Sequence, residues 1–278
     1  MNKTENKIIM VPHDFSDASN QALEFSAYLA KKMKYNLGIL NIQDSGTLSY
    51  FKNHGLNISK LEDELANISK DISNRYFIET TYLIKPKAPI KQIGKIAYEN
   101  DAVFLGIGLE KPKAGASRIM QLIAKSPVPV FVVYDRQFMP ITDIVFPLDD
   151  TEESRQKTGW AAHVALATDA TIHIYSINLE SQSENIVYAH NIIIKQVEKY
   201  FSEKWIKYKT VYAPDEKNSF GSHYVKYAES IDAGLIIIMR ESRSFLSSII
   251  WDPNDKAVFY NSKKIPALIV NPKNYAAR

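Results

Sequence analysis

The stretch KIIMVPHDFSDAS, residues 7–19, decides the fold of this chain because it occurs twice. Its second copy is DIVFPLDDTEES, residues 143–154. Each copy is an apolar run, then Pro-x-Asp-x-Ser or Pro-x-Asp-x-Thr, then acidic residues of the kind that begin a helix. An apolar run without alternation is typical of a strand buried on both faces of a parallel sheet. The two stretches therefore predict two copies of one strand–turn–helix unit.

The repeat continues to the end of both halves. The pair Asp-Ala precedes an apolar run at residues 101–105 and again at 232–238. Each half then closes on a proline followed by a strand-like run, at 128–133 and 265–270. The offset of roughly 135 residues is too long for a solenoid repeat and is the usual length of one domain.

With 278 residues, 45% of them hydrophobic, the chain is long enough for two cores. We place the first domain at residues 1–137 and the second at 138–278. The link between the repeats, residues 135–142, is short. We therefore expect the two domains to pack against each other rather than to move freely.

Apolar runs alternate with amphipathic stretches, which is typical of βαβ units in the α/β fold class. The first half predicts strands at 8–11, 37–42, 77–84, 102–105 and 128–134. It predicts a helix capped by Ser16 or Asp17, further helices at 61–72, 89–98 and 117–124, and a loop over 43–60. The second half predicts strands at 144–146, 171–177, 205–212, 235–239 and 265–270. Its predicted helices are at 152–167, 185–203 and 222–230.

Composition excludes several classes of protein. The chain has no cysteine, which excludes a disulfide framework and a thiolate metal site. Its 34 basic and 31 acidic residues nearly balance, and no basic stripe interleaves with aromatics, so we expect no nucleic-acid partner. No apolar run approaches the roughly 18 residues of a membrane span, and no signal core precedes the first strand. We expect a cytoplasmic protein that does not enter a membrane.

Both halves resemble the universal stress protein family. The resemblance rests on the Pro-x-Asp-x-Ser strand end at 12–16, the late Asp-Ala strand with glycine at 101–106 and the final Pro-Val strand at 129–133. It implies two tandem five-stranded parallel α/β/α domains, Rossmann-like or flavodoxin-like. It also implies an internal pseudo-dimer joined through the final strands. The implied role is cytoplasmic stress adaptation by binding rather than by turnover.

One branch of that family binds ATP through Gly-x2-Gly-x9-Gly-[Ser/Thr] after the fourth strand. Glycines let backbone N–H groups approach phosphates. Here Gly106 matches the first glycine and Ser117 the final hydroxyl residue, but Ala116 replaces the last glycine and the loop is short. Gly108 and Gly115 are candidate substitutes. The alternative is a plain connecting loop, so ATP or AMP is a candidate cofactor of the first domain and no cofactor is certain.

The resemblance also nominates Asp14 and Ile42 as adenosine contacts in the first domain. Asp14 follows the first strand, at the carboxyl edge where open α/β sheets bind ligands. The alternative is that Asp14 and its counterpart Asp149 cap a turn or a helix. Both interpretations stay open, because Asp149 is present in the half whose loop lacks the glycine pattern.

In the second half the matching loop, MRESRSFLSSIIWDPN over residues 239–254, contains no glycine. Family-style nucleotide binding is therefore not expected there. Arg240 and Arg243 are candidates for an anion patch, and Trp251 is a candidate plug of the vacated site. A solvated loop is the simpler interpretation.

The sequence offers little for catalysis. The six histidines show no metal-ligand spacing, and neither a Walker loop nor a nucleophile elbow occurs. Trp160, Trp205 and Trp251 are expected in a core or an interface. We expect no metal and no enzyme, and a stress-response binding or regulatory module with degraded nucleotide-binding loops. The alternative is an ATP/AMP-binding sensor that uses the first domain, with slow hydrolysis. A further homodimer and an unknown protein partner are left open.

Overall fold

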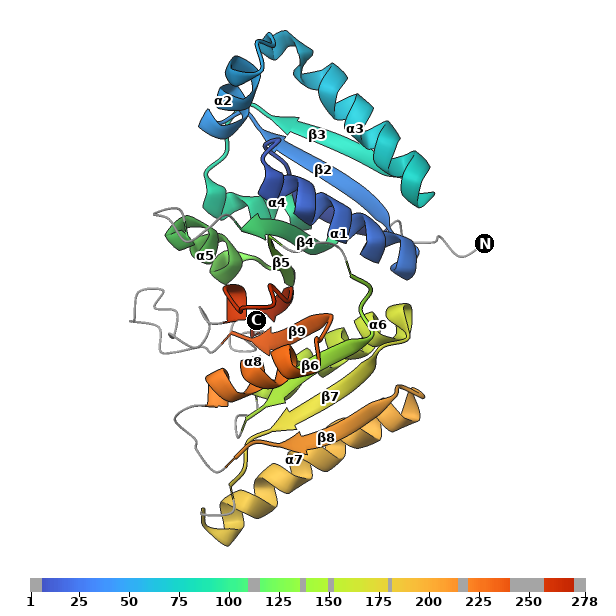
Figure 1. Cartoon of the computed structure of the whole chain (residues 1–278), viewed down its shortest axis with the longest axis vertical. Helices are drawn as coiled ribbons and strands as arrows, with labels where there is room; N and C mark the ends of the chain where they lie inside the picture. The colour runs from blue at the N-terminus through green and yellow to red at the C-terminus, as the bar shows by residue number, and fades with distance from the viewer. Residues whose placement is uncertain are drawn as a thin grey trace. The chain divides into compact units, whose positions relative to one another are not determined.

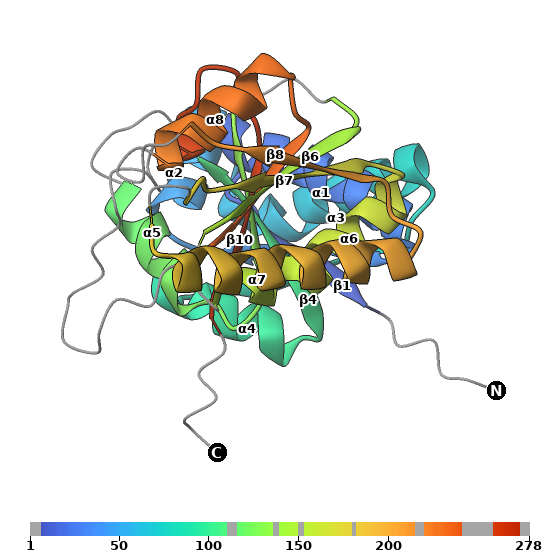
Figure 2. The same cartoon turned by 90° about the horizontal axis from the view of Figure 1, so that it is seen from below.

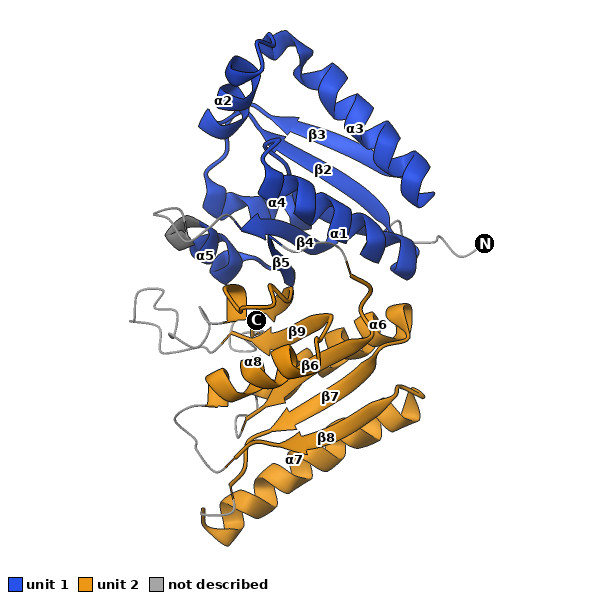
Figure 3. Cartoon of the chain, in the orientation of Figure 1, with its two compact units in different colours: residues 1–138 blue, residues 139–278 orange. Residues whose placement is uncertain are grey.

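A computed structural model describes residues 7–109, 116–135, 139–149, 153–179, 182–214, 220–240 and 258–272. The chain divides into two compact units, residues 1–138 and 139–278 (Figure 3). Within the described residues each unit holds five strands, and the strand pairs within each unit are parallel. The predicted fold class, two tandem α/β domains with five-stranded parallel sheets, is confirmed.

The first unit has the strand order β3-β2-β1-β4-β5 (Figure 1). Its elements in chain order are β1 (Ile8–Pro12), α1 (Asp17–Met33), β2 (Asn36–Ile42), α2 (Ser45–Asn53), α3 (Leu61–Tyr76), β3 (Thr80–Lys85), α4 (Ile93–Glu99), β4 (Ala102–Leu109), α5 (Ala116–Lys125) and β5 (Val130–Tyr134). Helices α1 and α3 pack together on one face, and α4 packs with α5. Right-handed crossovers put these two pairs on opposite faces of the sheet.

The second unit has the order β10-β9-β6-β7-β8. Its elements are β6 (Asp143–Leu148), a 3-10 helix (Glu153–Lys157), α6 (Thr158–Thr168), β7 (Thr171–Ser176), α7 (Glu184–Glu203), β8 (Tyr208–Tyr212), α8 (Phe220–Ser230), β9 (Leu235–Met239) and β10 (Ala267–Val270). Figure 2 shows α7 and α8 on opposite faces of this sheet. In the described parts of the chain, no helix is both long and apolar enough to cross a lipid bilayer.

The central strands are apolar on both faces, as the sequence predicts. In β1, Ile9 and Met10 point to opposite faces of the sheet and both are buried, and so are Ile39 and Leu40 in the neighbouring β2. Burying both faces of a parallel sheet under helices removes large apolar side chains from water, at roughly 1.5–3 kcal/mol for each one. This gain in free energy favours the strand conformation for these apolar segments.

Several predictions of element bounds are wrong. Residues 43–60 were predicted as a loop, but they contain α2 and a 3-10 turn, Ile58–Lys60. The Asp44 carboxylate caps α2 by accepting from the N–H groups of Gly46 and Thr47 at 2.9 and 3.2 Å. Phe51 is then buried on the inner side of the helix.

The third strand begins at Thr80 instead of residue 77, because α3 continues to Tyr76. Phe77 ends that helix in the left-handed region, with φ +56°, and its side chain is 86% exposed. In the second unit the predicted helix over 152–167 begins as a 3-10 helix and becomes α-helical only at Thr158. Trp205, predicted in a core or interface, is 94% exposed.

Candidate functional site

The carboxyl end of β1 leads into a turn built on Asp14. Its Oδ1 accepts from the backbone N–H and the hydroxyl of Ser16, at 3.1 and 2.6 Å. Ser16 then caps α1 by accepting from the N–H of Ser19 at 3.2 Å, and Asp17 lies in the first helical turn. Asp14 therefore caps a turn, as one of the two interpretations expected. Its second oxygen, Oδ2, makes no hydrogen bond with the described residues.

The end of β2 is tied to β1 and to α2 by buried hydrogen bonds. The amide of Asn41 donates to the carbonyl of His13 at 2.8 Å and to the hydroxyl of Thr47 at 3.1 Å. Thr47 donates in turn to the carbonyl of Ile42 at 3.0 Å, and Asp44 N–H donates to the same carbonyl at 2.7 Å. These bonds fix the start of α2 at the carboxyl edge, and they occupy the Ile42 carbonyl.

An aromatic stack lies between the β1–α1 turn and α2. Phe15 has φ +68°, a left-handed conformation that is rare and costly for a bulky residue. Its ring stacks on Tyr50 at 4.7 Å with an interplanar angle of 16°, and Tyr50 lies 4.1 Å from the ring of His54. Phe51 packs edge-on against Phe15 from the buried side, at 5.4 Å. The strained turn thus places Phe15 in a stack of three rings, which we call the Phe15–Tyr50–His54 stack.

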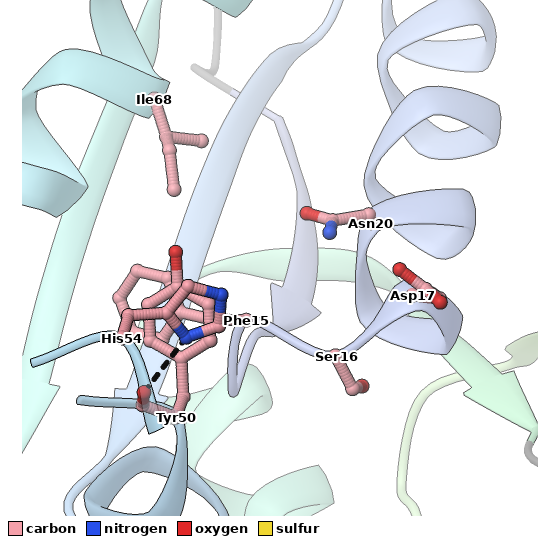
Figure 4. A pocket seen from close by; sticks show the side chains of 7 residues that line it. All are labelled: Phe15, Ser16, Asp17, Asn20, Tyr50, His54 and Ile68. Carbon is pink, nitrogen blue, oxygen red and sulfur yellow. Dashed lines mark hydrogen bonds between the residues drawn. The ribbon is translucent and has the colours of Figure 1, made fainter. Parts of the chain in front are cut away.

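This stack forms one wall of an open pocket of about 390 Å³ in the first unit. Figure 4 shows the three rings grouped on one side, Asn20 and Asp17 on the other, and Ile68 of α3 above. Ser16 completes the lining. The pocket therefore has an aromatic wall and a polar wall, and its lining comes from helices α1, α2 and α3 and the turn that enters α1.

The sequence pattern alone does not predict this pocket. None of the five predicted site residues lines it, although Phe15 directly follows Asp14. The available signal was the spacing of Tyr50 and His54, which puts two aromatic rings on one side of a helix. This spacing is informative only within a helix, and the sequence predicts a loop over residues 43–60.

Gly106 and Gly108 do not lie in a loop. The fourth strand was predicted to end at residue 105, but β4 continues to Leu109 and pairs with β5, Gly106 with Phe131 and Gly108 with Val133. A Cβ at Gly106 would overlap the hydroxyl of Ser26, and a Cβ at Gly108 would overlap the carbonyl of Ala18. Both glycines therefore allow α1 to pack closely on β4. The prediction that they lie in a loop after the strand is wrong, because β4 extends under α1.

The other predicted residues of the loops are described only in part. Ser117 lies in the first turn of α5, and its side chain is outside the described part of the structure. Gly115, Arg243 and Trp251 also lie outside the described residues. Arg240 is described, and its Nε donates to the Asn271 side chain at 2.9 Å.

The second unit has a buried lysine at the matching edge of its sheet. Lys157 is 2% exposed, and its Nζ donates to the carbonyl and hydroxyl of Ser154, at 3.0 and 2.8 Å. It also lies 4.7 Å from the centre of the Phe146 ring. Burial lowers the pKa of Lys157 to about 8, although the charge of Asp149 opposes this shift.

The repeat explains why a lysine fits there. With Asp14 aligned on Asp149, Lys157 takes the place of Ala22, a fully buried residue of α1. In the second unit β9 has Ile237 and Met239 where β4 has glycines, so its helix has no glycine surface to pack on. The lysine side chain lies there against the Phe146 ring and reaches the Ser154 hydroxyl. Sequence reasoning missed it because a single lysine in a helical stretch ordinarily indicates a solvated face.

Comparison with known proteins agrees with this architecture. Residues 5–134 match the universal stress protein family model. A search of curated proteins found no match.

Solved structures cover the whole chain at low identity. The chain is similar to a universal stress protein from Archaeoglobus fulgidus DSM 4304, with 16% identity, TM-score 0.71, and 96% of this chain and 99% of that chain covered. It is similar to a functionally unknown protein from Pseudomonas aeruginosa PAO1, with 15% identity, TM-score 0.61, and 96% and 92% covered. It is also similar to the cytoplasmic domain of a prokaryotic cation chloride cotransporter, with 9% identity, TM-score 0.54, and 95% and 94% covered.

At these identities the structures establish the fold alone, whereas the family match establishes descent for the first unit. The tandem arrangement of two α/β units agrees with both findings. The first unit therefore belongs to the universal stress protein family, whose sequence pattern is recognised over residues 5–134 and whose fold extends over both units.

Proposed function

We propose that this tandem universal stress protein is a cytoplasmic stress-response binding or regulatory module that does not turn over ATP. The observation that carries the proposal is the position of Gly106 and Gly108 inside β4, against α1. A phosphate cradle needs backbone N–H groups that are exposed and unpaired. At these glycines the backbone belongs to a strand ladder instead, and the missing Cβ atoms serve helix packing.

The proposal predicts that ATP with Mg²⁺ leaves thermal unfolding unchanged. A ligand at 100 times its dissociation constant would stabilise the folded state by about 2.7 kcal/mol and raise the melting temperature by roughly 2–4 °C. We expect shifts below this range for ATP and AMP at millimolar concentration. A reproducible rise of the melting temperature by this amount with ATP would contradict a function that is independent of nucleotide.

The second candidate is an ATP/AMP-binding sensor that uses the first domain. It is supported by the Oδ2 atom of Asp14, which has no hydrogen bond among the described residues at the carboxyl edge of the sheet. Asp14→Asn separates the two functions, because the amide oxygen can still accept from Ser16 while the charge is lost. A nucleotide-induced shift that disappears in Asp14→Asn would favour the sensor.

For the assembly we propose domains at residues 1–137 and 138–278 that pair through their final strands. Each final strand is apolar, and a free apolar sheet edge promotes aggregation. The apolar composition of the final strands and the short link between the repeats support this pairing.

A further inference from the structure

The pocket of the first unit contains one charged side chain. Asp17 is exposed, and no lysine or arginine lines the pocket. The N-terminus of α1 contributes about half a positive charge there, but Asp17 supplies a full negative charge beside it. The pocket therefore has a net negative character, which disfavours phosphates and carboxylates and favours a neutral or cationic ligand.

The aromatic wall favours the same kind of ligand. The faces of aromatic rings carry partial negative charge and attract cations within about 6 Å. Phe15 and Tyr50 are stacked nearly in parallel, and His54 is the exposed member of the stack. Planar rings suit such a wall because stacking leaves little surface in contact with water.

The polar groups of the pocket are held in fixed orientations. Nδ1 of His54 donates to the carbonyl of Tyr50 at 2.9 Å, which leaves Nε2 of the neutral ring as an acceptor. Oδ1 of Asn20 accepts from Nε2 of the buried His13 at 2.9 Å, so the Asn20 amide presents its N–H donors to the pocket. Burial lowers the pKa of His13, while the Asn20 hydrogen bond and the Asp14 charge oppose this shift.

We propose that this pocket binds a planar aromatic cation, with its ring against the Phe15–Tyr50–His54 stack and its positive charge beside Asp17. The ring is a nitrogen heterocycle, whose edge groups pair with the Asn20 donors and with Nε2 of His54. The strained conformation of Phe15 agrees with a built site, since strain of this kind persists where the surrounding structure holds it for function. Gly106, Gly108 and Ser117 do not line this pocket.

Three probes of one size and three charges test the proposal on the full chain. They are 1-methylnicotinamide, a cation; nicotinamide, which is neutral; and nicotinate, an anion. Affinities are measured by calorimetry or by ligand-observed NMR at pH 7.5. We expect the cation to bind about three to ten times more tightly than nicotinamide, and nicotinate to bind most weakly.

Two substitutions assign the contacts. Asp17→Asn should abolish the preference for the cation while keeping the affinity for nicotinamide, and Tyr50→Leu should weaken all ring binding. His54→Gln is the second aromatic variant, at an exposed position that does not endanger folding. Glu184→Gln is the matched control, because Glu184 also follows a serine at a helix start, in the second unit. Glu184→Gln should leave the affinities of all three probes unchanged.

The opposite results overturn the proposal. The proposal is wrong if nicotinate binds most tightly, if all three probes bind with equal affinity, or if no probe binds at millimolar concentration. It is also wrong if Asp17→Asn still binds the cation more tightly than nicotinamide.

Discussion

Gly108 of β4 lies against the carbonyl oxygen of Ala18, so closely that a Cβ at position 108 would overlap it. The contact is with backbone, which cannot rotate away as the end of a flexible side chain can. Gly108 therefore sets the distance between α1 and the sheet, a structural role in the position where the family pattern suggested phosphate binding.

We predict that Gly108→Ala destabilises the first unit by about 2–3 kcal/mol, in the presence or absence of nucleotide. The reason is that α1 must move away from β4 to admit the methyl group. The measurement is the urea midpoint of unfolding. Gly159→Ala in α6 is the control, because its Cβ would meet only the Tyr200 hydroxyl at 3.8 Å. That substitution should be neutral, or stabilising by up to about 1 kcal/mol. Equal midpoints for Gly108→Ala and the wild type would show that α1 does not rest on this glycine.

We predict that Lys157→Met is more stable than the wild type at pH 7, by about 1–3 kcal/mol. In the folded state the pKa of Lys157 is about 8, below its ordinary value near 10.4 in the unfolded chain. Below pH 8 the folded state therefore carries the full cost of a buried ammonium. Between about pH 8 and 10.4 the unfolded state binds more protons, so this lysine makes folding more favourable as pH rises.

The difference in unfolding free energy between Lys157→Met and the wild type should consequently shrink from pH 7 to pH 10. Urea unfolding of both proteins at several pH values measures it. Lys199→Met is the control, because Lys199 is largely exposed and its substitution should shift stability by less than about 0.5 kcal/mol at any pH. A gap that stays constant with pH would mean that Lys157 keeps its ordinary pKa in the folded state.

We predict that ATP hydrolysis is far slower than the roughly 1–100 per second of a typical kinase. Phosphoryl transfer depends on a lysine-bearing phosphate cradle, a held Mg²⁺ and a residue that orients the nucleophile. Gly106 and Gly108 are inside a strand, and among the described residues no cluster of three or more His, Asp or Glu is placed to hold a metal. Phosphate release from purified protein tests this. Turnover above about 1 per second that is lost in Asp14→Ala would refute the binding-module function.

We predict that residues 1–137, expressed alone, self-associate or lose stability relative to the full chain. Their final strand would be an apolar edge without its proposed partner strand. Sedimentation velocity and thermal unfolding measure the two effects. A monomeric fragment as stable as the full chain would contradict pairing through the final strands.

Much of the fold was predictable from the sequence because strand formation depends on local pattern. The apolar runs at 8–11 and 144–146 predict buried parallel strands, and the structure contains them as β1 and β6. Ser16 was predicted as a helix cap and is one. Helix α2 was missed because its apolar content is low, and what stabilises it is a side-chain cap and the anchoring of Thr47 by Asn41.

The sequence by itself determined the repeat and the α/β class and indicated the family, since each depends on local patterns of residues along the chain. Only the tertiary structure placed Gly106 and Gly108 under α1, buried Lys157 and formed the pocket. The close approach of Gly108 to Ala18, the burial of Lys157 beside Phe146 and the meeting of Phe15, Tyr50 and Ile68 join residues distant in sequence. A glycine that admits a phosphate and a glycine that admits a helix have the same local pattern, and only the atoms packed against it distinguish them.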